Sequence, residues 1–305
     1  MALNCTVGGN PPYLAISVDG QPPQIVQAAA SVTVTMPSRT SAWAQHTCEV
    51  VVLSGDITVN RWTTPPFTLT GIVLASGTVS AIAARYSKKI LVFGDSLTEG
   101  FQTIAAVSSA ANSVTNTDAA YGLRAALGAE VGVIGFTGQG IAAAAPVNNG
   151  SIPALTGTYN YLYSGVARSF ASNPDLIVVC IGANDAHASA TQATMQAAFA
   201  TVLNGLLSAS PKSHIVVAIE PGGISTTYVT AAQRAVLIAA INAAVSAIAS
   251  SRIEVIDAAG WVNASQPTAD GVHPLGVSNQ QMVCPAAASA LRPYLFSPGR
   301  SFAFY

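Results

Sequence analysis

Apolar and polar residues follow two different rhythms along this chain, and the change falls near residue 86. Before it, alternating or β-branched apolar runs are separated by turn residues such as Gly, Pro and Asp. Short strands at regular spacing are typical of a β-sandwich or jelly roll. The predicted strands are Tyr13–Val18, Ala30–Met36, His46–Leu53, Phe67–Leu74 and Thr78–Arg85.

From Lys88 onward, short continuous apolar runs alternate with segments of helical periodicity. The runs are too continuous for half-exposed strands, so they indicate a parallel sheet that is covered on both faces. The alternation predicts a doubly wound α/β domain at 87–305, preceded by a small all-β domain at 1–86. The expected strands are Ile90–Phe93, Val131–Phe136, Leu176–Ile181, Ile215–Ile219 and Ile253–Ile256. The expected helices lie near Ala119–Leu127, Gln192–Leu207, Ala231–Ala249 and Ser278–Leu291.

Charged residues are scarce in this chain of 305 residues. They make up 8% of the sequence and the formal net charge is -1, whereas about a quarter of an average domain is charged. No basic run is present to neutralise phosphates, which argues against nucleic acid as a partner. A sparsely charged surface suits neutral partners such as sugars, or packing against copies of the same chain, and is equally that of an Ala-rich soluble protein.

Neither a membrane span nor a leader is expected. The most apolar segment, Val236 to Ile248, is interrupted by Asn242 and Ser246 and predicts a buried helix. The first residues lack the basic and apolar regions of a signal peptide, although a trimmed chain would look the same.

The four cysteines show no CxxC spacing, so a zinc site is not predicted. Cys180 lies in a buried apolar run and is expected to be a core residue. A disulfide between Cys5 and Cys48 is left open.

The exits of the predicted parallel strands carry the candidate chemistry, because ligands bind at the carboxyl ends of such strands. At the first exit, Gly94-Asp95-Ser96 places a hydroxyl in a tight strand-to-helix turn, beside the N–H groups of a helix start. By itself this triplet is weak, since Asp95 or Ser96 would serve equally as a helix cap.

The second exit, from Ile134 to Gly140, supplies glycines whose backbone N–H groups can approach an oxyanion. Residues 138–143 also match the Gly-x-Gly-x-x-Ala nucleotide fingerprint. That fingerprint needs an acidic residue about 20 positions later. None occurs between Glu130 and Asp175, so a nucleotide site is rejected.

The third exit contains Asn184, whose amide can donate to an oxyanion, although Asn184-Asp185 is also an ordinary turn pair. After the fifth strand, Asp270 precedes His273 by three residues in a loop that contains glycine. A turn there can bring the carboxylate onto the imidazole and fix its tautomer. His187 follows Asn184 closely and is a candidate for the edge of the pocket.

Together these four motifs resemble the GDSL, or SGNH, hydrolase superfamily over about residues 88 to 295. The resemblance implies a flavodoxin-like sheet and a serine esterase that needs no cofactor or metal ion. Its signature residues would be Ser96, Gly138, Asn184 and His273, with Asp270 completing a triad. The expected oxyanion donors are the N–H groups of Ser96 and Gly138 and the side-chain amide of Asn184.

The layout of the whole chain is similar to carbohydrate esterase family 2, which joins a jelly roll to an SGNH domain. Residues 46–52, 67–71, 121–123 and 138–140 carry this likeness. It implies removal of acetyl groups from plant polysaccharides, and hence an extracellular enzyme. Two departures are Val133, where many superfamily members have Asn, and Asp270, since the catalytic His of family 2 often lacks an Asp three residues earlier.

The loop between Gly140 and Arg168 is a candidate for substrate specificity. Tyr159, Tyr161 and Tyr163 can stack on sugar rings, or alternate Tyr residues can form a small surface strand. Two other functions stay open: a broad short-chain carboxylesterase or thioesterase, and a non-catalytic carbohydrate-binding or assembly protein. The sequence does not fix the sugar, the oligomeric state or the compartment.

Overall fold

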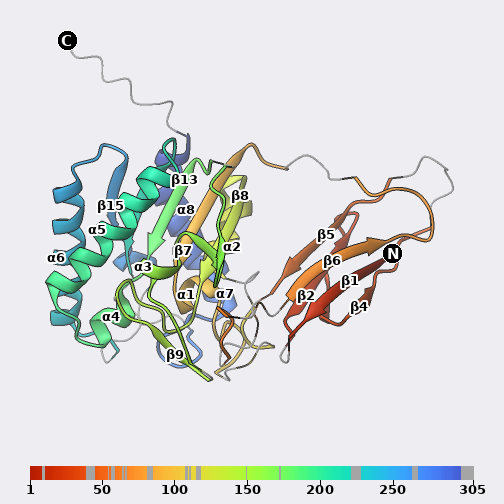
Figure 1. Ribbon diagram of the computed structural model, residues 1–305, viewed down its shortest axis with the longest axis horizontal. Coiled ribbons are helices and arrows are strands. Elements are labelled where there is room, and N and C mark those ends of the chain that lie inside the picture. Colours follow the sequence, from red (N-terminus) through yellow and green to blue (C-terminus); the bar gives the residue numbers. More distant parts are fainter. Residues whose placement is uncertain are drawn as a thin grey trace, which may run out of the picture.

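The structure is a computed structural model with an α/β body and a smaller β body (Figure 1). It describes residues 1–8, 11–38, 45–53, 55, 59–63, 65, 67–80, 85–106, 109, 111–114, 118–148, 150–171, 173–220, 228–262 and 267–296.

Five parallel strands form the centre of the α/β body. They are β7 (Lys88–Gly94), β8 (Ala129–Gly135), β13 (Leu176–Cys180), β14 (His214–Ile219) and β15 (Ile253–Asp257). Their spatial order is β15-β14-β13-β7-β8, and every pairing is parallel. Numbered along the chain this order is 2-1-3-4-5, the flavodoxin-like arrangement, with its switch point between β7 and β13. The predicted fold class is confirmed.

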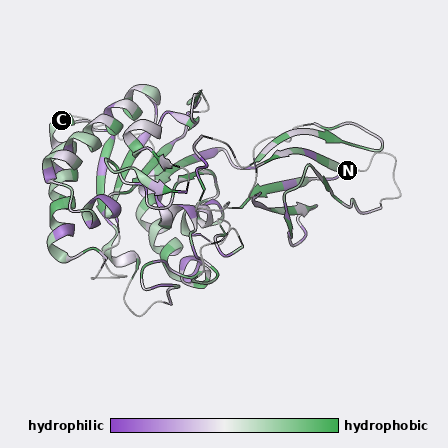
Figure 2. Ribbon diagram, turned by 60° about the horizontal axis from the view of Figure 1, so that its bottom comes forward, coloured by the Kyte–Doolittle hydropathy of each residue, from purple (hydrophilic) through white to green (hydrophobic). Residues whose placement is uncertain are grey.

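Helices cover both faces of this sheet (Figure 1). The helices α4 (Ala183–His187), α5 (Gln192–Ala209) and α6 (Ala231–Ile248) pack on one face, and α2 (Ala119–Leu127) and α8 (Cys284–Phe296) pack on the other. Successive residues of β13 and β14 alternate between the two apolar cores, as expected for strands buried on both sides. Figure 2 shows the resulting hydrophobic centre between the helices.

Two helical predictions are sharpened by the structure. The expected helix near Ser278–Leu291 begins with the one-turn helix α7 (Gly276–Ser278) and the π-helical turn η3 (Asn279–Val283), which leads directly into α8. In the described part of the chain, α6 alone is long and apolar enough to cross a membrane. Its residues Leu237, Ala240, Ile241 and Ala244 are buried against the sheet, whereas the rest of the helix is partly or fully exposed, so α6 buries one face only.

The N-terminal body consists of two antiparallel three-stranded sheets, ordered β4-β1-β6 and β3-β2-β5. The strands are β1 (Ala2–Val7), β2 (Tyr13–Val18), β3 (Gln24–Gln27), β4 (Ser31–Thr33), β5 (Cys48–Val52) and β6 (Phe67–Val73). Inward-facing side chains of both sheets, including Leu3 from β1 and Leu14 and Ile16 from β2, form one core. The two sheets are therefore a small sandwich.

Two expectations for this body need correction. Residues 78–80 lie outside any strand, so the predicted strand Thr78–Arg85 is wrong there, and 81–84 lie outside the described residues. β-branched side chains alone misled that prediction, because Val79 is exposed and lacks the burial that stabilises a strand. The open disulfide is not formed: Cys5 and Cys48 are both free thiols in the sandwich core.

One segment of the N-terminal half, residues 59–63, packs into the α/β body. The Trp62 carbonyl accepts the Ser164 N–H at 2.8 Å, and the Trp62 ring meets Phe136 and Tyr161 edge-on. Arg61, only 9% exposed, forms an ion pair with Glu99. A boundary between two domains at residue 86 stays a prediction. Residues 59–63 lie before this boundary in sequence but pack against the α/β body in space.

Replacing Arg61 with methionine is expected to lower the free energy of unfolding by about 3 kcal/mol, because Glu99 is then a buried carboxylate without its cation. The matched control is Arg124→Met. Arg124 pairs across the halves with Glu49, which is half-exposed, and this variant should lose at most about 1 kcal/mol. Urea unfolding of both variants measures the difference, and equal losses would contradict a stabilising role for the buried pair.

Candidate active site

The first strand exit forms a tight turn from β7 into the short helix α1 (Ser96–Glu99). Gly94 is required there, because a Cβ would lie 1.9 Å from the Thr98 hydroxyl and 2.7 Å from the Cys180 carbonyl. Asp95 caps the helix by accepting the Leu97 N–H at 3.1 Å. The cap expected as an alternative to a nucleophile is thus made by Asp95, and it leaves the hydroxyl of Ser96 available.

The loop after β15 holds the acid and the base. Asp270 Oδ1 accepts the backbone N–H groups of Val272 and His273, both at 2.9 Å, and Gly271, directly after Asp270, has φ +86°. The turn therefore folds the Asp270 carboxylate back onto the imidazole, and Asp270 Oδ2 lies 2.8 Å from His273 Nδ1.

The hydroxyl, imidazole and carboxylate are in line. His273 Nε2 lies 2.9 Å from Ser96 Oγ, so the ring bridges Ser96 and Asp270 through its two nitrogens. The His273 ring is 9% exposed and packs edge-on against Phe101 at 4.6 Å. Its orientation is therefore fixed by two hydrogen bonds and one aromatic contact.

The loop after β8 is braced from both ends. Glu99 accepts the Thr137 N–H at 2.8 Å and the Thr137 hydroxyl at 2.7 Å. Asp185 accepts the N–H groups of residues 141, 142 and 143 at 2.6 to 2.9 Å. Between the braces, Gly138 has φ +79°, a backbone conformation that favours glycine.

Asn184, in the first turn of α4, is oriented by three partners. Its Nδ2 donates to Asp95 Oδ2 at 2.8 Å and to the Gln139 carbonyl at 3.0 Å, and its Oδ1 accepts the hydroxyl of Tyr228 at 2.6 Å. The amide nitrogen therefore faces the nucleophile turn. Both of its hydrogens already have acceptors, so donation to a third oxygen requires sharing or releasing one of them.

The backbone N–H groups of Ser96 and Gly138 make no hydrogen bond to another described residue. Two of the three expected oxyanion donors are therefore free at this edge of the sheet, and the third is shared.

The aromatic candidates for substrate binding lie in different settings. Tyr159 packs against the main core beside α5, and Tyr161 packs on Trp62, so the structure uses both rings in packing. Tyr161 and Tyr163 belong to the short strand β11 (Tyr161–Tyr163), the alternative left open from the sequence. His187 is exposed, and its ring stacks on that of Tyr228 with the ring centroids 4.2 Å apart. Tyr228 in turn contacts Asn184 through its hydroxyl.

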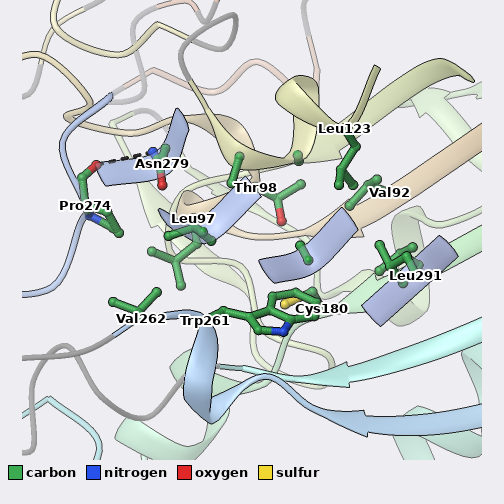
Figure 3. A pocket seen from close by; sticks show the side chains of 15 residues that line it. Val92, Leu97, Thr98, Leu123, Cys180, Trp261, Val262, Pro274, Asn279 and Leu291 are labelled. Carbon is green, nitrogen blue, oxygen red and sulfur yellow. Dashed lines mark hydrogen bonds between the residues drawn. The ribbon is translucent and has the colours of Figure 1, made fainter. Parts of the chain in front are cut away.

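An apolar cavity of about 70 Å³ lies under the nucleophile turn, between the sheet and the α2–α8 layer (Figure 3). Leu97, Pro274 and Trp261 line it, together with Cys180, the expected core cysteine. Neither Ser96, Gly138, Asn184 nor His273 lines the cavity. It is therefore a packing void behind the site and not the place where the reaction occurs.

A serine, histidine and aspartate in line at the carboxyl edge of a flavodoxin-like sheet define the class of serine hydrolases. Residues 92–276, more than half of the chain, match the family described as GDSL-like Lipase/Acylhydrolase family. The chain belongs to this family and is a serine ester hydrolase.

Solved structures share the two-part layout. A family 2 carbohydrate esterase from Clostridium thermocellum in complex with cellohexaose has a TM-score of 0.75 at 19% identity, over 96% of this chain and 89% of that chain. A Corynascus thermopiles (Myceliophthora fergusii) family 2 enzyme with a carbohydrate binding domain has a TM-score of 0.72 at 19% identity, over 96% and 92%. An acetyl xylan esterase from Butyrivibrio proteoclasticus has a TM-score of 0.67 at 16% identity, over 96% of this chain and 87% of that chain. The search of curated proteins found no match.

Sequence reasoning missed Tyr228 and Glu99, which support the predicted site residues, and it took Asp185 only as the turn partner of Asn184. Tyr228 orients Asn184, and Glu99 and Asp185 brace the loop around Gly138. Glu99 lies three positions after Ser96, and Asp185 directly follows Asn184, so closeness in sequence could have indicated both. No such closeness in sequence indicates Tyr228. Within the described ranges, no cluster of three His, Cys, Asp or Glu side chains could hold a metal ion.

Proposed function

We propose that this protein removes short acyl groups, principally acetyl groups, from carbohydrate esters through an acyl-enzyme on Ser96. The observation that supports the chemistry is the line from Ser96 Oγ through the two ring nitrogens of His273 to Asp270, with separations of 2.9 and 2.8 Å. The layout shared with carbohydrate esterases supports the substrate class, and so does the sparsely charged sequence.

In the proposed reaction, Ser96 Oγ attacks the ester carbonyl carbon while His273 Nε2 takes the hydroxyl proton. Asp270 holds the tautomer and stabilises the imidazolium. Collapse of the tetrahedral intermediate expels the sugar alkoxide, which takes the proton from His273. Water then attacks the acyl-serine with His273 as base, releasing acetate and restoring Ser96.

The negative oxygen of the intermediate would be held by the N–H groups of Ser96 and Gly138 and by Asn184. Asn184 can contribute by sharing with the oxyanion the amide hydrogen that it now donates to the Gln139 carbonyl. The bond from Tyr228 keeps the amide oxygen away from the substrate, because it fixes the side chain in one orientation.

Replacing Asn184 with alanine is expected to lower kcat about 100- to 1000-fold with little change in KM, because the amide acts on charge that develops in the transition state. Tyr228→Phe is the matched control. It keeps the amide and removes only the orienting hydroxyl, so the expected loss is about tenfold. Steady-state kinetics on p-nitrophenyl acetate measure both, and an Asn184→Ala enzyme with unchanged kcat would exclude the amide as a donor.

A broad short-chain carboxylesterase is the second candidate. It is favoured by the packing of Tyr159 and Tyr161 into the protein, which leaves less aromatic surface for a sugar ring.

The deciding experiment compares hydrolysis of acetyl, butyryl and octanoyl p-nitrophenyl esters with release of acetate from an acetylated xylo-oligosaccharide. We expect acetyl esters to be preferred and the oligosaccharide to be deacetylated. A preference for octanoyl esters, or an inert oligosaccharide, would contradict the carbohydrate assignment. Labelling by a fluorophosphonate probe tests the nucleophile independently of substrate, and correctly folded protein that is not labelled would contradict the serine mechanism.

A further inference from the structure

The end of the fourth parallel strand carries a carboxyl group that the proposed chemistry does not use. Glu220 directly follows β14 and is 3% exposed. Its Oε2 accepts the N–H of Ala183, the first residue of α4. The nearby Arg234 reaches only the Glu220 backbone carbonyl and pairs its charge with Asp257, so the described residues provide no cation for this side chain.

The Glu220 carboxyl group lies beside that of Asp95, the residue before the proposed nucleophile, and Asp95 is only 2% exposed. Two carboxylates in contact in a buried site cannot both be ionised, so at neutral pH the pair holds a proton. The contact is therefore a hydrogen bond between one carboxylic acid and one carboxylate.

The surroundings assign the proton to Glu220. Asp95 accepts hydrogen bonds from Leu97 and Asn184, which favour its ionised form, and it lies near His273. Glu220 Oε1 accepts no hydrogen bond from a described donor, so it is the oxygen that can carry a proton. Burial, together with the charge of Asp95, raises the pKa of Glu220 well above its usual range, whereas burial raises that of Asp95 to about 6.

We propose that Glu220 is a positioning residue for ester hydrolysis: as a neutral acid it donates a hydrogen bond to Asp95 and so holds the nucleophile turn and Asn184 together. Asp95 is the shared element, because it caps the helix that begins at Ser96 and accepts the amide of Asn184. Glu220 also accepts the backbone N–H of Ala183, the residue before Asn184. The proposal rests on the proposed esterase function.

Ionisation of Glu220 would place a second negative charge beside Asp95 and remove the bridging hydrogen bond. Four other titratable groups face the pair: His273 from the triad loop, Asp185 from α4, Cys180 from β13 and Tyr228 from the segment before α6. Burial raises the pKa of the Cys180 thiol well above its usual value and that of Tyr228 to about 12. A loss of kcat with rising pH that Glu220→Gln moves to higher pH would therefore report Glu220 and not Cys180 or Tyr228.

The test compares Glu220→Gln with Glu220→Ala. Glutamine keeps one oxygen for the Ala183 N–H and permanently supplies a donor for Asp95, whereas alanine removes both. We expect Glu220→Gln to keep kcat within about threefold at pH 7 and to move the alkaline loss of kcat to higher pH. We expect Glu220→Ala to lose about 10- to 100-fold in kcat with little change in KM. Glu254→Gln, on the half-buried strand β15, is the control and should keep the wild-type pH profile.

Stability gives a second readout. Glu220 binds a proton in the folded state that it loses in the unfolded state near neutral pH. The contribution of Glu220 to stability is therefore full below its unfolded-state pKa and is lost as pH rises toward its folded-state pKa. The free energy of unfolding of Glu220→Gln should therefore fall less with rising pH than that of the wild type.

The proposal would be overturned if wild type and Glu220→Gln shared one pH profile, or if Glu220→Ala were fully active. Impairment of Glu220→Gln equal to that of Glu220→Ala would also overturn it. A wild type without activity on any ester, and unlabelled by fluorophosphonate, would instead contradict the esterase function itself. If Glu220→Ala does not fold, the pH profile of Glu220→Gln compared with that of the wild type still tests the proposal.

Discussion

Replacing Ser96 with alanine is expected to lower kcat for acetyl ester hydrolysis by about a millionfold, the scale of losing a serine nucleophile. The reason is that no acyl-enzyme can form, while the donors around Gly138 and the binding surface are unchanged. Within the described part of the chain, the only hydrogen-bond partner of the hydroxyl is the His273 ring. Its removal should therefore cost about 1 kcal/mol, and the Tm should stay within about 4 °C of the wild type.

Initial rates with p-nitrophenyl acetate, together with fluorophosphonate labelling and thermal unfolding, measure this prediction. Ser210→Ala is the matched control. It removes a buried serine just before β14, at the amino end of the sheet, and should keep full activity. Labelling that persists in Ser96→Ala, or turnover above about one percent of the wild type, would point to a different nucleophile.

Replacing Asp270 with asparagine is expected to lower kcat by about ten thousandfold. Asparagine can keep the two backbone hydrogen bonds that shape the loop, but its amide would donate to His273 Nδ1. The ring would then carry its proton on Nε2, where it must accept one from Ser96. The same variant should therefore also label slowly with fluorophosphonate while unfolding cooperatively.

The acid dependence of stability gives Asp270→Asn a second signature. Burial raises the pKa of Asp270, but hydrogen bonds from the His273 ring and from the N–H groups of His273 and Val272 outweigh it and hold the pKa well below its usual range. A lowered pKa contributes stability above the unfolded-state value that is lost as pH falls. The variant should lose less stability between about pH 5 and pH 2 than the wild type. Asp175→Asn, which removes a carboxylate paired with Lys88 before β13, is the control and should keep near-normal kcat.

The α/β half could be predicted closely because its signals are local. Each parallel strand is a short apolar run, and Ser96, Gly138 and Asn184 follow such runs within a few residues. Asp270 follows β15 after a longer segment. In a flavodoxin-like sheet all strands are parallel, so the residues that follow their carboxyl ends lie at one edge of the sheet. The strand β1 escaped prediction because its partners β4 and β6 lie far away in sequence. The strand β3 escaped because it has four residues, three of them exposed, and so shows no buried apolar face.

Residues that act on other residues could not be predicted in the same way. Glu220 looks like any acid at the end of a strand, and only its contact with Asp95 makes it unusual. The three tyrosines stay predicted substrate contacts. The structure adds that Tyr159 packs beside α5 and Tyr161 packs on Trp62, contacts between segments that no periodicity reveals.

The segment that contains Arg61 and Trp62 matters when the α/β half is joined to a different N-terminal domain. Arg61 pairs with Glu99, and Glu99 holds the loop next to Gly138. A transplanted α/β half cut at residue 86 would keep Ser96, Asp270 and His273, the proposed triad, and yet lose the cation that pairs with Glu99 behind the Gly138 loop. Chimeras of such esterases should therefore carry residues 59–63 with the catalytic half, or supply the same two side chains from the new partner.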